Sequence, residues 1–305
     1  FDVIPYYFKF RHFLNLPFLV KRADLVFIWF ASYHAFITIL VANLFKKPKV
    51  VVVGGYDASN IKGYGIFSSW IGRKMGRYIY RNSDRIFVVD ESLKKDIIAN
   101  SKLNEIAKKI GVIPTGYDPH RWYPAGEKEK MVLTVCYVNE SNWWRKGLNT
   151  FMKAAELLPD VPFYVVGKME ERLKNMVEQA GDNVTFTGWV SDNQLLHLYQ
   201  KAKVYCQISK YEGLPNVLCE AMLCKCVPVG TDILGVKTAI GSTGFYVSYG
   251  DEEATVEAIK KALYEYSDLG KRARERIIAM FSPEMREQLL VEQIMELVGD
   301  KNVGN

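Results

Sequence analysis

The chain has 305 residues, and 49% of them are hydrophobic, which is enough to build two domains of ordinary size around separate cores. Its formal net charge of +6 is modest and spread along the chain, so we exclude a protein dedicated to nucleic-acid binding. A weakly basic chain of this kind suits small anionic ligands or an anionic membrane surface.

The five cysteines predict reduced thiols of a cytoplasmic protein, because their number is odd and most of them lie in hydrophobic runs. Three of them, Cys219, Cys224 and Cys226, are close enough in sequence to suggest a metal cluster. We favour buried core cysteines instead, because no fourth ligand lies near and a free cysteine is commonly a small core residue. We therefore expect no metal site there.

The stretch from Leu25 to Phe45 contains no Asp, Glu, Lys or Arg and is long enough to span a bilayer. Its character nevertheless changes along its length. A run of β-forming residues from Leu25 to Phe30 is followed by small and polar residues at 31–34 and then by a helical pattern. We predict a buried strand, a turn and a helix here rather than a membrane span.

Strands and helices alternate along the whole chain, which predicts parallel sheets joined by crossover helices. The strands are expected at 25–30, 50–53, 85–89, 110–113, 131–137, 162–166, 184–186, 204–207, 227–229 and 245–247. A polar stretch at 124–130 is typical of an interdomain linker. The final helix should begin with Ser282 as its cap and Pro283 in its first turn.

Residues 211–222, with the sequence YEGLPNVLCEAM, form the most informative motif, because a loop turns into a helix between two carboxylates. Gly213 can adopt backbone conformations closed to other residues, and Pro215 suits the first helical position. Backbone N–H groups from Leu214 to Val217 should then point outward, where they favour a phosphate. Glu212 and Glu220 can border the same cleft and accept hydrogen bonds from sugar hydroxyls.

A metal-binding D-x-D motif does not occur, since no Asp lies two residues from another Asp. The charge of a bound phosphate must then be met by protein cations. Arg145 and Lys146, which precede Gly147 at a predicted helix start, are the candidates. The alternative for each is a solvated charge at a helix end, and this alternative is stronger for Arg145 than for Lys146.

The 211–222 motif resembles the signature of retaining glycosyltransferases of the GT-B fold, in particular the GT4 group, also called glycosyltransferase group 1. The similarity extends to other segments, which occur in family order. These are residues 84–97, 108–124, 145–158, 184–206 and 242–251. A lone pair of glutamates would be weak evidence, whereas ordered segments from about Asp84 to Val298 make the resemblance strong.

The resemblance implies an α/β protein with two Rossmann-like domains that face a cleft. An acceptor-side domain would cover 1–125 and a nucleotide-sugar-binding domain 126–281, while the helix at 282–305 would cross back to the first domain. The implied activity is metal-independent hexosyl transfer with retention, from a nucleotide diphosphate sugar to a hydroxyl of a glycan or lipid-linked acceptor. No further cofactor is expected, and the donor and acceptor are the expected partners.

The resemblance also implies roles for individual residues. Glu220 would hold the ribose hydroxyls of the nucleotide and Glu212 the transferred sugar, while Lys146, with Arg145 beside it, would contact the diphosphate. The remaining donor contacts would come from the backbone of Gly213, Leu214, Pro215 and Asn216, and from Val190 beside Trp189 at the nucleobase. For each glutamate the alternative is a helix cap or an exposed helical residue.

The first domain departs most from the family pattern. Many members have a histidine after the strand that matches 50–53, where this chain has Gly54. Asp57 is the nearest carboxylate, and two roles are open for it: it contacts the acceptor, or it caps a loop. We expect His34 to be a structural histidine. The chain starts at Phe1 without the family's first strand and glycine loop, so we expect part of the acceptor site to lie outside it.

Residues 70–81 predict a helix that is rich in both basic and large apolar side chains, with Lys62 nearby. Such a helix could lie on anionic lipid headgroups and present a lipid-linked acceptor. The alternative is that its apolar side packs inside the first domain and its cations are solvated.

Two other functions also remain open for the chain as a whole. One is a sugar-nucleotide epimerase of the GT-B fold, and the other is a catalytically silent protein that binds sugar nucleotides.

Overall fold

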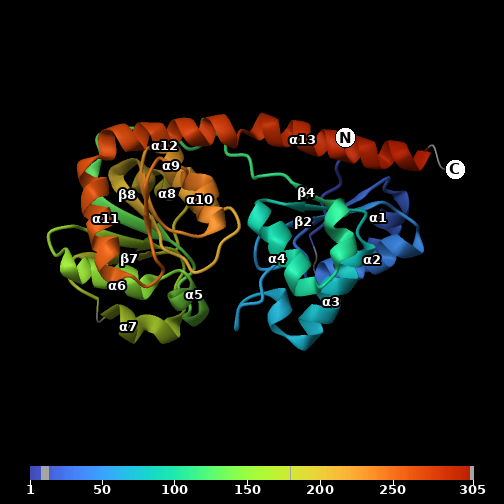
Figure 1. Cartoon of the computed structure of the whole chain (residues 1–305), viewed down its shortest axis with the longest axis horizontal. Helices are drawn as coiled ribbons and strands as arrows, with labels where there is room; N and C mark the ends of the chain where they lie inside the picture. Colours follow the sequence, from blue (N-terminus) through green and yellow to red (C-terminus); the bar gives the residue numbers. More distant parts are fainter. Residues whose placement is uncertain (8–13, 179, 303–305) are drawn as a thin grey trace. The chain divides into compact units, whose positions relative to one another are not determined.

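The computed structural model describes residues 1–7, 14–178 and 180–302. Within these ranges the chain forms two compact units (Figure 1). Unit 1 comprises Phe1–Pro114 and Glu287–Asn305, and unit 2 comprises Thr115–Arg286. The polar stretch at 124–130 lies inside unit 2, where Glu129 and Lys130 already belong to a strand.

Unit 1 contains a parallel four-stranded sheet in the order β1-β2-β3-β4. The strands are β1 Val26–Trp29, β2 Lys49–Val53, β3 Arg85–Val88 and β4 Ile110–Val112. The helices are α1 Leu16–Arg22, α2 Tyr33–Leu44, α3 Trp70–Asn82 and α4 Glu91–Ser101, with short 3-10 helices η2 Ile66–Ser68 and η3 Asn104–Lys109. All five residues of β2 are buried, as the run of β-branched valines predicts for a strand covered on both faces.

Unit 2 contains a parallel six-stranded sheet in the order β10-β9-β8-β5-β6-β7. Its strands are β5 Glu129–Val135, β6 Phe163–Val166, β7 Val184–Gly188, β8 Ala202–Gln207, β9 Val227–Thr231 and β10 Phe245–Val247. Its helical segments are α5 Glu140–Arg145, α6 Leu148–Leu157, η4 Glu171–Leu173, α7 Lys174–Glu178, α8 Asp192–Lys201, α9 Asn216–Leu223, α10 Leu234–Ile240, α11 Glu252–Tyr264 and α12 Tyr266–Met280. An apolar core of unit 2 joins the sheet to α6 and α11.

The last helix, α13 Pro283–Asn302, starts in unit 2 and continues on unit 1. The Ser282 hydroxyl accepts a hydrogen bond from the Met285 N–H at 3.1 Å, as predicted for the cap. Leu297 is buried against the core of the first sheet, with Leu289 and Leu290 packed beside it. The C-terminal helix therefore crosses back to the first domain, as predicted.

All ten predicted strands are present, and their ends shift by at most two residues; β5, for example, was expected at 131–137 and spans Glu129–Val135. The uncharged stretch at 25–45 forms β1, a turn and α2, which confirms the strand–turn–helix prediction. In the described part of the chain, no helix combines the length and the apolar character needed to cross a bilayer.

Candidate functional site

The order of strands in unit 2 points to a site between β5 and β8. The chain runs from β5 outward to β6 and β7, then returns to place β8 on the other side of β5. At such a switch point the loops that follow the two strands diverge, and ligands of open parallel sheets commonly bind in the crevice between them. Lys146 follows β5 and Glu212 follows β8.

The loop after β5 is built to approach the loop after β8. The Asn139 side chain caps α5 by accepting the Asn142 N–H at 2.7 Å. Gly147 ends the turn with φ of +69°, and a Cβ there would lie 2.2 Å from the backbone oxygen of Ile208. Only glycine permits both this conformation and this contact. The close approach lets the Lys210 N–H bond the Arg145 carbonyl at 2.7 Å.

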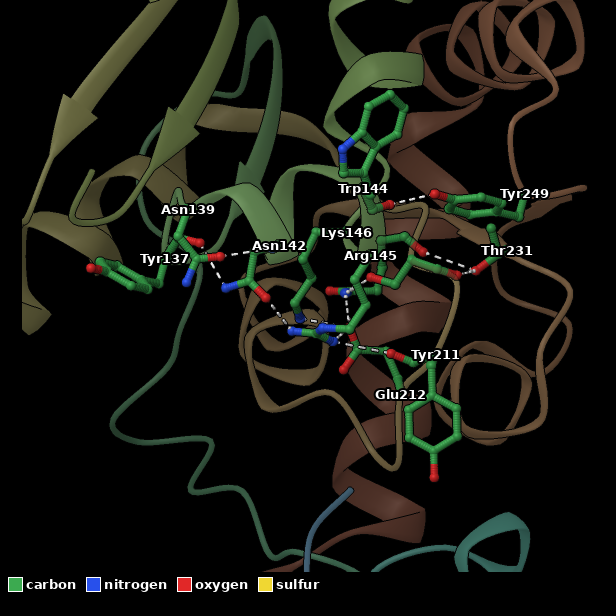
Figure 2. A network of polar contacts seen from close by, with 12 residues as sticks. Tyr137, Asn139, Asn142, Trp144, Arg145, Lys146, Tyr211, Glu212, Thr231 and Tyr249 are labelled. Atoms are coloured by element: carbon green, nitrogen blue, oxygen red, sulfur yellow. Dashed lines mark hydrogen bonds and ion pairs between the residues drawn. The ribbon is translucent and has the colours of Figure 1, made fainter. Parts of the chain in front are cut away.

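Glu212, Lys146 and Arg145 form an ion triad, which Figure 2 shows from close by. The Lys146 Nζ lies 2.5 Å from Glu212 Oε1, and Arg145 Nη1 lies 3.6 Å from the same oxygen. The side chains are 14% exposed for Lys146 and 10% and 11% for Arg145 and Glu212. Burial alone would raise the pKa of Glu212, but the two cations outweigh it and hold that pKa below its usual value.

Two amide side chains that sequence reasoning missed complete this network. Asn142 donates from Nδ2 to the Tyr137 carbonyl at 2.8 Å and accepts from Arg145 Nη2 at 2.7 Å. Gln207 donates from Nε2 to Glu212 Oε1 at 3.0 Å. A polar residue directly after the buried run at 204–206 was the available signal for Gln207.

The turn between Glu212 and α9 leads into a helix as predicted, with two differences. Gly213 is not among the glycines with a positive φ, so the turn does not use the conformation that favours glycine. Pro215 is the residue before the helix, and Asn216 rather than Pro215 occupies the first helical position. Gly213 and Leu214 are buried, and a Cβ on Gly235 would lie 1.5 Å from the Gly213 oxygen, so this turn is packed tightly against α10. In the first turn of α9 the Leu218 N–H bonds the Pro215 carbonyl at 3.2 Å, whereas the N–H groups of Asn216 and Val217 precede the first carbonyl that the helix itself can offer.

Glu220 lies one and a half turns into α9, where the Tyr199 hydroxyl donates to its Oε2 at 3.2 Å. Burial raises the pKa of Glu220 to about 7, although the Tyr199 hydrogen bond works in the opposite direction. It is therefore a half-buried carboxyl with a hydrogen-bonding partner, not an exposed helical residue.

Val190 lies beyond the end of β7 and is half-buried, and its neighbour Trp189 is exposed. Because β7 is an edge strand two places from β5, this segment lies further along the same carboxyl edge of the sheet. The assignment of Val190 to a nucleobase contact remains a prediction.

Asp57 lies in unit 1, in the loop after β2, and is 1% exposed. Its Oδ1 accepts the N–H groups of Gly54 and Gly55 at 3.1 and 2.9 Å, and its Oδ2 accepts that of Ala31 at 3.0 Å. Burial raises the pKa of Asp57. These contacts correspond to the loop-capping alternative, whereas an acceptor contact at Asp57 or Gly54 remains a prediction.

His34 is a satisfied structural histidine, as expected. Its Nε2 lies 2.7 Å from the Trp29 carbonyl and its Nδ1 lies 2.7 Å from the Ser32 hydroxyl. The five cysteines are all buried free thiols. Among the described residues, His, Cys, Asp and Glu side chains form no group of three or more that could hold a metal ion.

Two family models match successive parts of the chain. The model described as glycosyltransferase family 4 matches residues 3–121, and the one described as glycosyl transferases group 1 matches residues 131–265. The chain belongs to the family of group 1 glycosyltransferases, also called glycosyltransferase family 4. The matched ranges include the Asp57 loop in the first model, and Lys146, Glu212 and Glu220 in the second.

Curated relatives of the family resemble the chain at modest identity. It is 25% identical over 211 residues to alpha-galactosylglucosyldiacylglycerol synthase of Streptococcus pneumoniae, covering 62% of this chain and 54% of that protein. It is 30% identical over 150 residues to the lipopolysaccharide core biosynthesis glycosyltransferase LpsE of Rhizobium meliloti, covering 46% and 43%. The chain thus spans about half the length of these two relatives.

Solved structures confirm the GT-B fold. Anabaena Alr3699/HepE, crystallised in complex with UDP, has a TM-score of 0.78 at 15% identity, covering 93% of this chain and 82% of that one. Sucrose-phosphate synthase from Thermosynechococcus elongatus has a TM-score of 0.72 at 21% identity, covering 95% and 81%. At these identities the likeness concerns the fold alone.

Proposed function

We propose that this chain transfers a hexosyl unit from a nucleotide diphosphate sugar, with retention of configuration, to a hydroxyl of a glycan or lipid-linked acceptor. The observation that carries the proposal is the ion triad of Lys146, Arg145 and Glu212 at the β5/β8 switch point. It combines cations suited to a diphosphate with a carboxylate suited to sugar hydroxyls, at the edge of the sheet where ligands bind.

Each residue of the site takes one part of the donor. Glu220 holds the ribose, Glu212 the transferred sugar, and Lys146 with Arg145 the diphosphate. Val190 borders the nucleobase, and backbone groups of the turn between Glu212 and α9 contact sugar and phosphate; the residues of that turn are Gly213, Leu214, Pro215 and Asn216. Gly54 and the Asp57 loop in unit 1 belong to the acceptor side.

Catalysis in this proposal rests on positioning and on charge. As the bond from the sugar to the diphosphate breaks, negative charge grows on the leaving group, and the cations stabilise it more than the ground state. Each charge-assisted contact contributes about 1.5–3 kcal/mol, or roughly tenfold to a hundredfold in rate if it forms mainly in the transition state. Because the sequence lacks D-x-D and supplies two cations, we propose that no metal is required.

A panel of nucleotide sugars scored by protection from thermal unfolding tests donor binding. Glu220→Ala should chiefly weaken nucleotide binding, whereas Glu212→Ala should chiefly lower turnover. Glu156→Ala, which removes an exposed carboxylate of a surface ion pair, is the matched control. If both site variants bind and turn over the donor like the parent, the site is elsewhere.

Thermal protection, combined with an assay that follows donor conversion and nucleotide release, separates the other two functions. An epimerase would convert the donor without any acceptor, and a silent binding protein would be protected by the donor but release no nucleotide. Family membership does not favour either alternative. Chelator should leave the activity largely unchanged; activity that is lost in chelator and returns with Mg²⁺ or Mn²⁺ would contradict metal independence.

We also propose that the protein works in the cytoplasm and contacts a membrane surface through the start of α3. Trp70 and Ile71 are 62% and 69% exposed, and the Lys74 Nζ lies 4.0 Å from the Trp70 ring centroid. Arg73 and Arg77 instead donate to backbone carbonyls of unit 1, at Phe67 and Ser101. Within residues 70–77 the exposed apolar and basic groups are therefore Trp70, Ile71 and Lys74.

Cosedimentation with vesicles tests this contact. We expect binding to anionic phosphatidylglycerol vesicles at low salt, and weaker binding at high salt or to neutral phosphatidylcholine vesicles. Replacing Trp70, Ile71 and Lys74 together should reduce binding more than replacing Arg73 and Arg77. Absence of binding under every condition would favour a water-borne acceptor.

A further inference from the structure

Gln207 ends β8 in a buried position, 3% exposed, and its amide has a partner for each polar atom. The Tyr205 hydroxyl donates to Gln207 Oε1 at 3.2 Å. Gln207 Nε2 donates to the Ser209 hydroxyl at 2.8 Å and to Glu212 Oε1 at 3.0 Å. Because the Glu212 carboxylate can only accept, its contact with Nε2 fixes which way the amide points.

Three donors therefore converge on one oxygen of Glu212: the Lys146 ammonium, the Arg145 guanidinium and the Gln207 amide. The two cations stand on or just after the short helix α5, whereas Gln207 belongs to a central strand of the sheet. Gln207 is the neutral donor of the three, and the Ser209 hydroxyl, which accepts from its amide, is a second neutral group hydrogen-bonded to Glu212. A diphosphate competes with Glu212 for ammonium and guanidinium groups, because it is the stronger anion, but it has little to gain from a neutral amide already bonded to two oxygens.

We propose that Gln207 is the positioning residue for Glu212: it holds the carboxylate toward the transferred sugar when Lys146 and Arg145 turn to the diphosphate. Tyr205 supports it by fixing the amide orientation. The inference rests on the proposed function, because it assigns the sugar to Glu212. It makes a distinct prediction, since Gln207 should affect the binding of the sugar and leave the binding of the nucleotide diphosphate unchanged.

The test measures, by titration calorimetry, the dissociation constant of a nucleotide diphosphate and that of the corresponding nucleotide sugar. The probes are UDP with UDP-glucose, ADP with ADP-glucose, and GDP with GDP-mannose, and the pair that the parent binds is used. In Gln207→Met, which keeps the length of the side chain and removes its three hydrogen bonds, we expect the nucleotide sugar to bind about tenfold more weakly. The nucleotide diphosphate should bind within twofold of the parent. Tyr205→Phe should shift the ratio in the same direction by a smaller factor.

A matched control distinguishes positioning from packing. Thr134 lies in β5, is buried, and donates its hydroxyl to the Cys206 carbonyl at 3.0 Å. Thr134→Val removes a buried hydrogen bond from the same sheet, so it should lower the midpoint of thermal unfolding without changing the ratio of the two dissociation constants.

Gln207→Glu supplies a second readout, because it places a carboxyl where the amide now bonds Glu212. At low pH the protonated carboxyl can still donate to Glu212, so preference for the sugar form should persist. As pH rises, two neighbouring carboxylates repel, and the variant should lose affinity for the sugar form while the parent does not. A purely structural role for Gln207 predicts no such pH dependence of the ratio.

The outcomes separate this inference from the proposed function. If the parent binds none of these nucleotides or sugars, the proposed function fails and the inference fails with it. If the parent binds them but Gln207→Met weakens both members of a pair equally, as a packing defect would, only the inference is overturned. If Gln207→Met does not fold, an unchanged ratio in Tyr205→Phe together with a pH-independent ratio in Gln207→Glu overturns it.

Discussion

Asp57 in unit 1 and Glu212 in unit 2 are both carboxylates with little solvent exposure, in loops that follow a strand of a parallel sheet, yet their pKa values shift in opposite directions. Asp57 bonds three backbone N–H groups, and burial raises its pKa. Glu212 bonds an ammonium and an amide beside a guanidinium, and its pKa is lowered. The partners, more than the depth of burial, decide the charge state.

The two arrangements suit different tasks. Backbone N–H groups cannot leave their carboxylate without unfolding the loop, so Asp57 fixes the conformation of the Gly54–Gly55 turn and ties it to Ala31. Lysine and arginine side chains can rotate to another anion, so the charge around Glu212 is available to a ligand. The first carboxylate therefore builds a loop, and the side-chain cations around the second can exchange partners, as the proposed donor site requires.

Asp57→Ala should have the largest effect on stability. It leaves three buried N–H groups without an acceptor, and we expect the free energy of unfolding to fall by about 4 kcal/mol. Urea denaturation measures this loss. Asp57→Asn, which retains one carbonyl oxygen, should lose less, and Asp192→Ala, in an exposed ion pair, should lose less than about 1 kcal/mol. A loss for Asp57→Ala no larger than for Asp192→Ala would remove the loop-building role.

Glu220 sharpens the comparison, because its hydrogen-bonding partner is a neutral hydroxyl and its pKa is raised from 4.5 to about 7. Between pH 4.5 and about pH 7, Glu220 therefore keeps its proton in the folded protein but has lost it in the unfolded chain. Stability should therefore fall by about 3 kcal/mol as the pH rises through this window. Urea denaturation at pH 4.5 and pH 7.5 measures the change, and Glu220→Gln should lose most of it. An equal pH dependence in both proteins would contradict the assignment.

Lys146→Ala tests the exchangeable side of the comparison. It removes one of the two cations and leaves Arg145, so turnover of the nucleotide sugar should fall by about tenfold or more. Lys153→Ala, which removes a surface lysine paired with Glu156, should keep the parent rate in the same assay. A Lys146→Ala enzyme with unchanged turnover would show that the triad is only structural.

Gly54→Ala should have the smallest effect and tests how rigid the Asp57 loop is. A Cβ there would lie 2.7 Å from the ring of Phe30, whose own φ of 67° already strains its backbone. Moving the ring should cost about 1 kcal/mol in urea denaturation. Gly111→Ala, where the Cβ would meet Phe87 at 3.5 Å, should cost less. The cost should shrink in the Phe30→Ala background; an undiminished cost would assign it to another contact.

The sequence determined the local elements and the family. β-branched runs, helix caps and polar turns are read from neighbouring residues, and all ten strands appear where those patterns predict them. The two glutamates of the 211–222 motif and the basic pair before Gly147 were found in the same way, because their spacing along the chain carries the signal. The family resemblance, and not periodicity, led us to expect that the glutamates and the basic pair lie in one site.

Only the tertiary structure decided how the charges are paired. The contact between Lys146 and Glu212 joins residues 66 positions apart, and the order of β5 and β8 in the sheet brings them together. Sequence reasoning left Asp57 open between two roles and did not find Gln207 or Asn142. A hydrogen bond depends on the distance and direction between two groups, and for residues far apart in the chain these are set by strand order and packing, which no local pattern encodes.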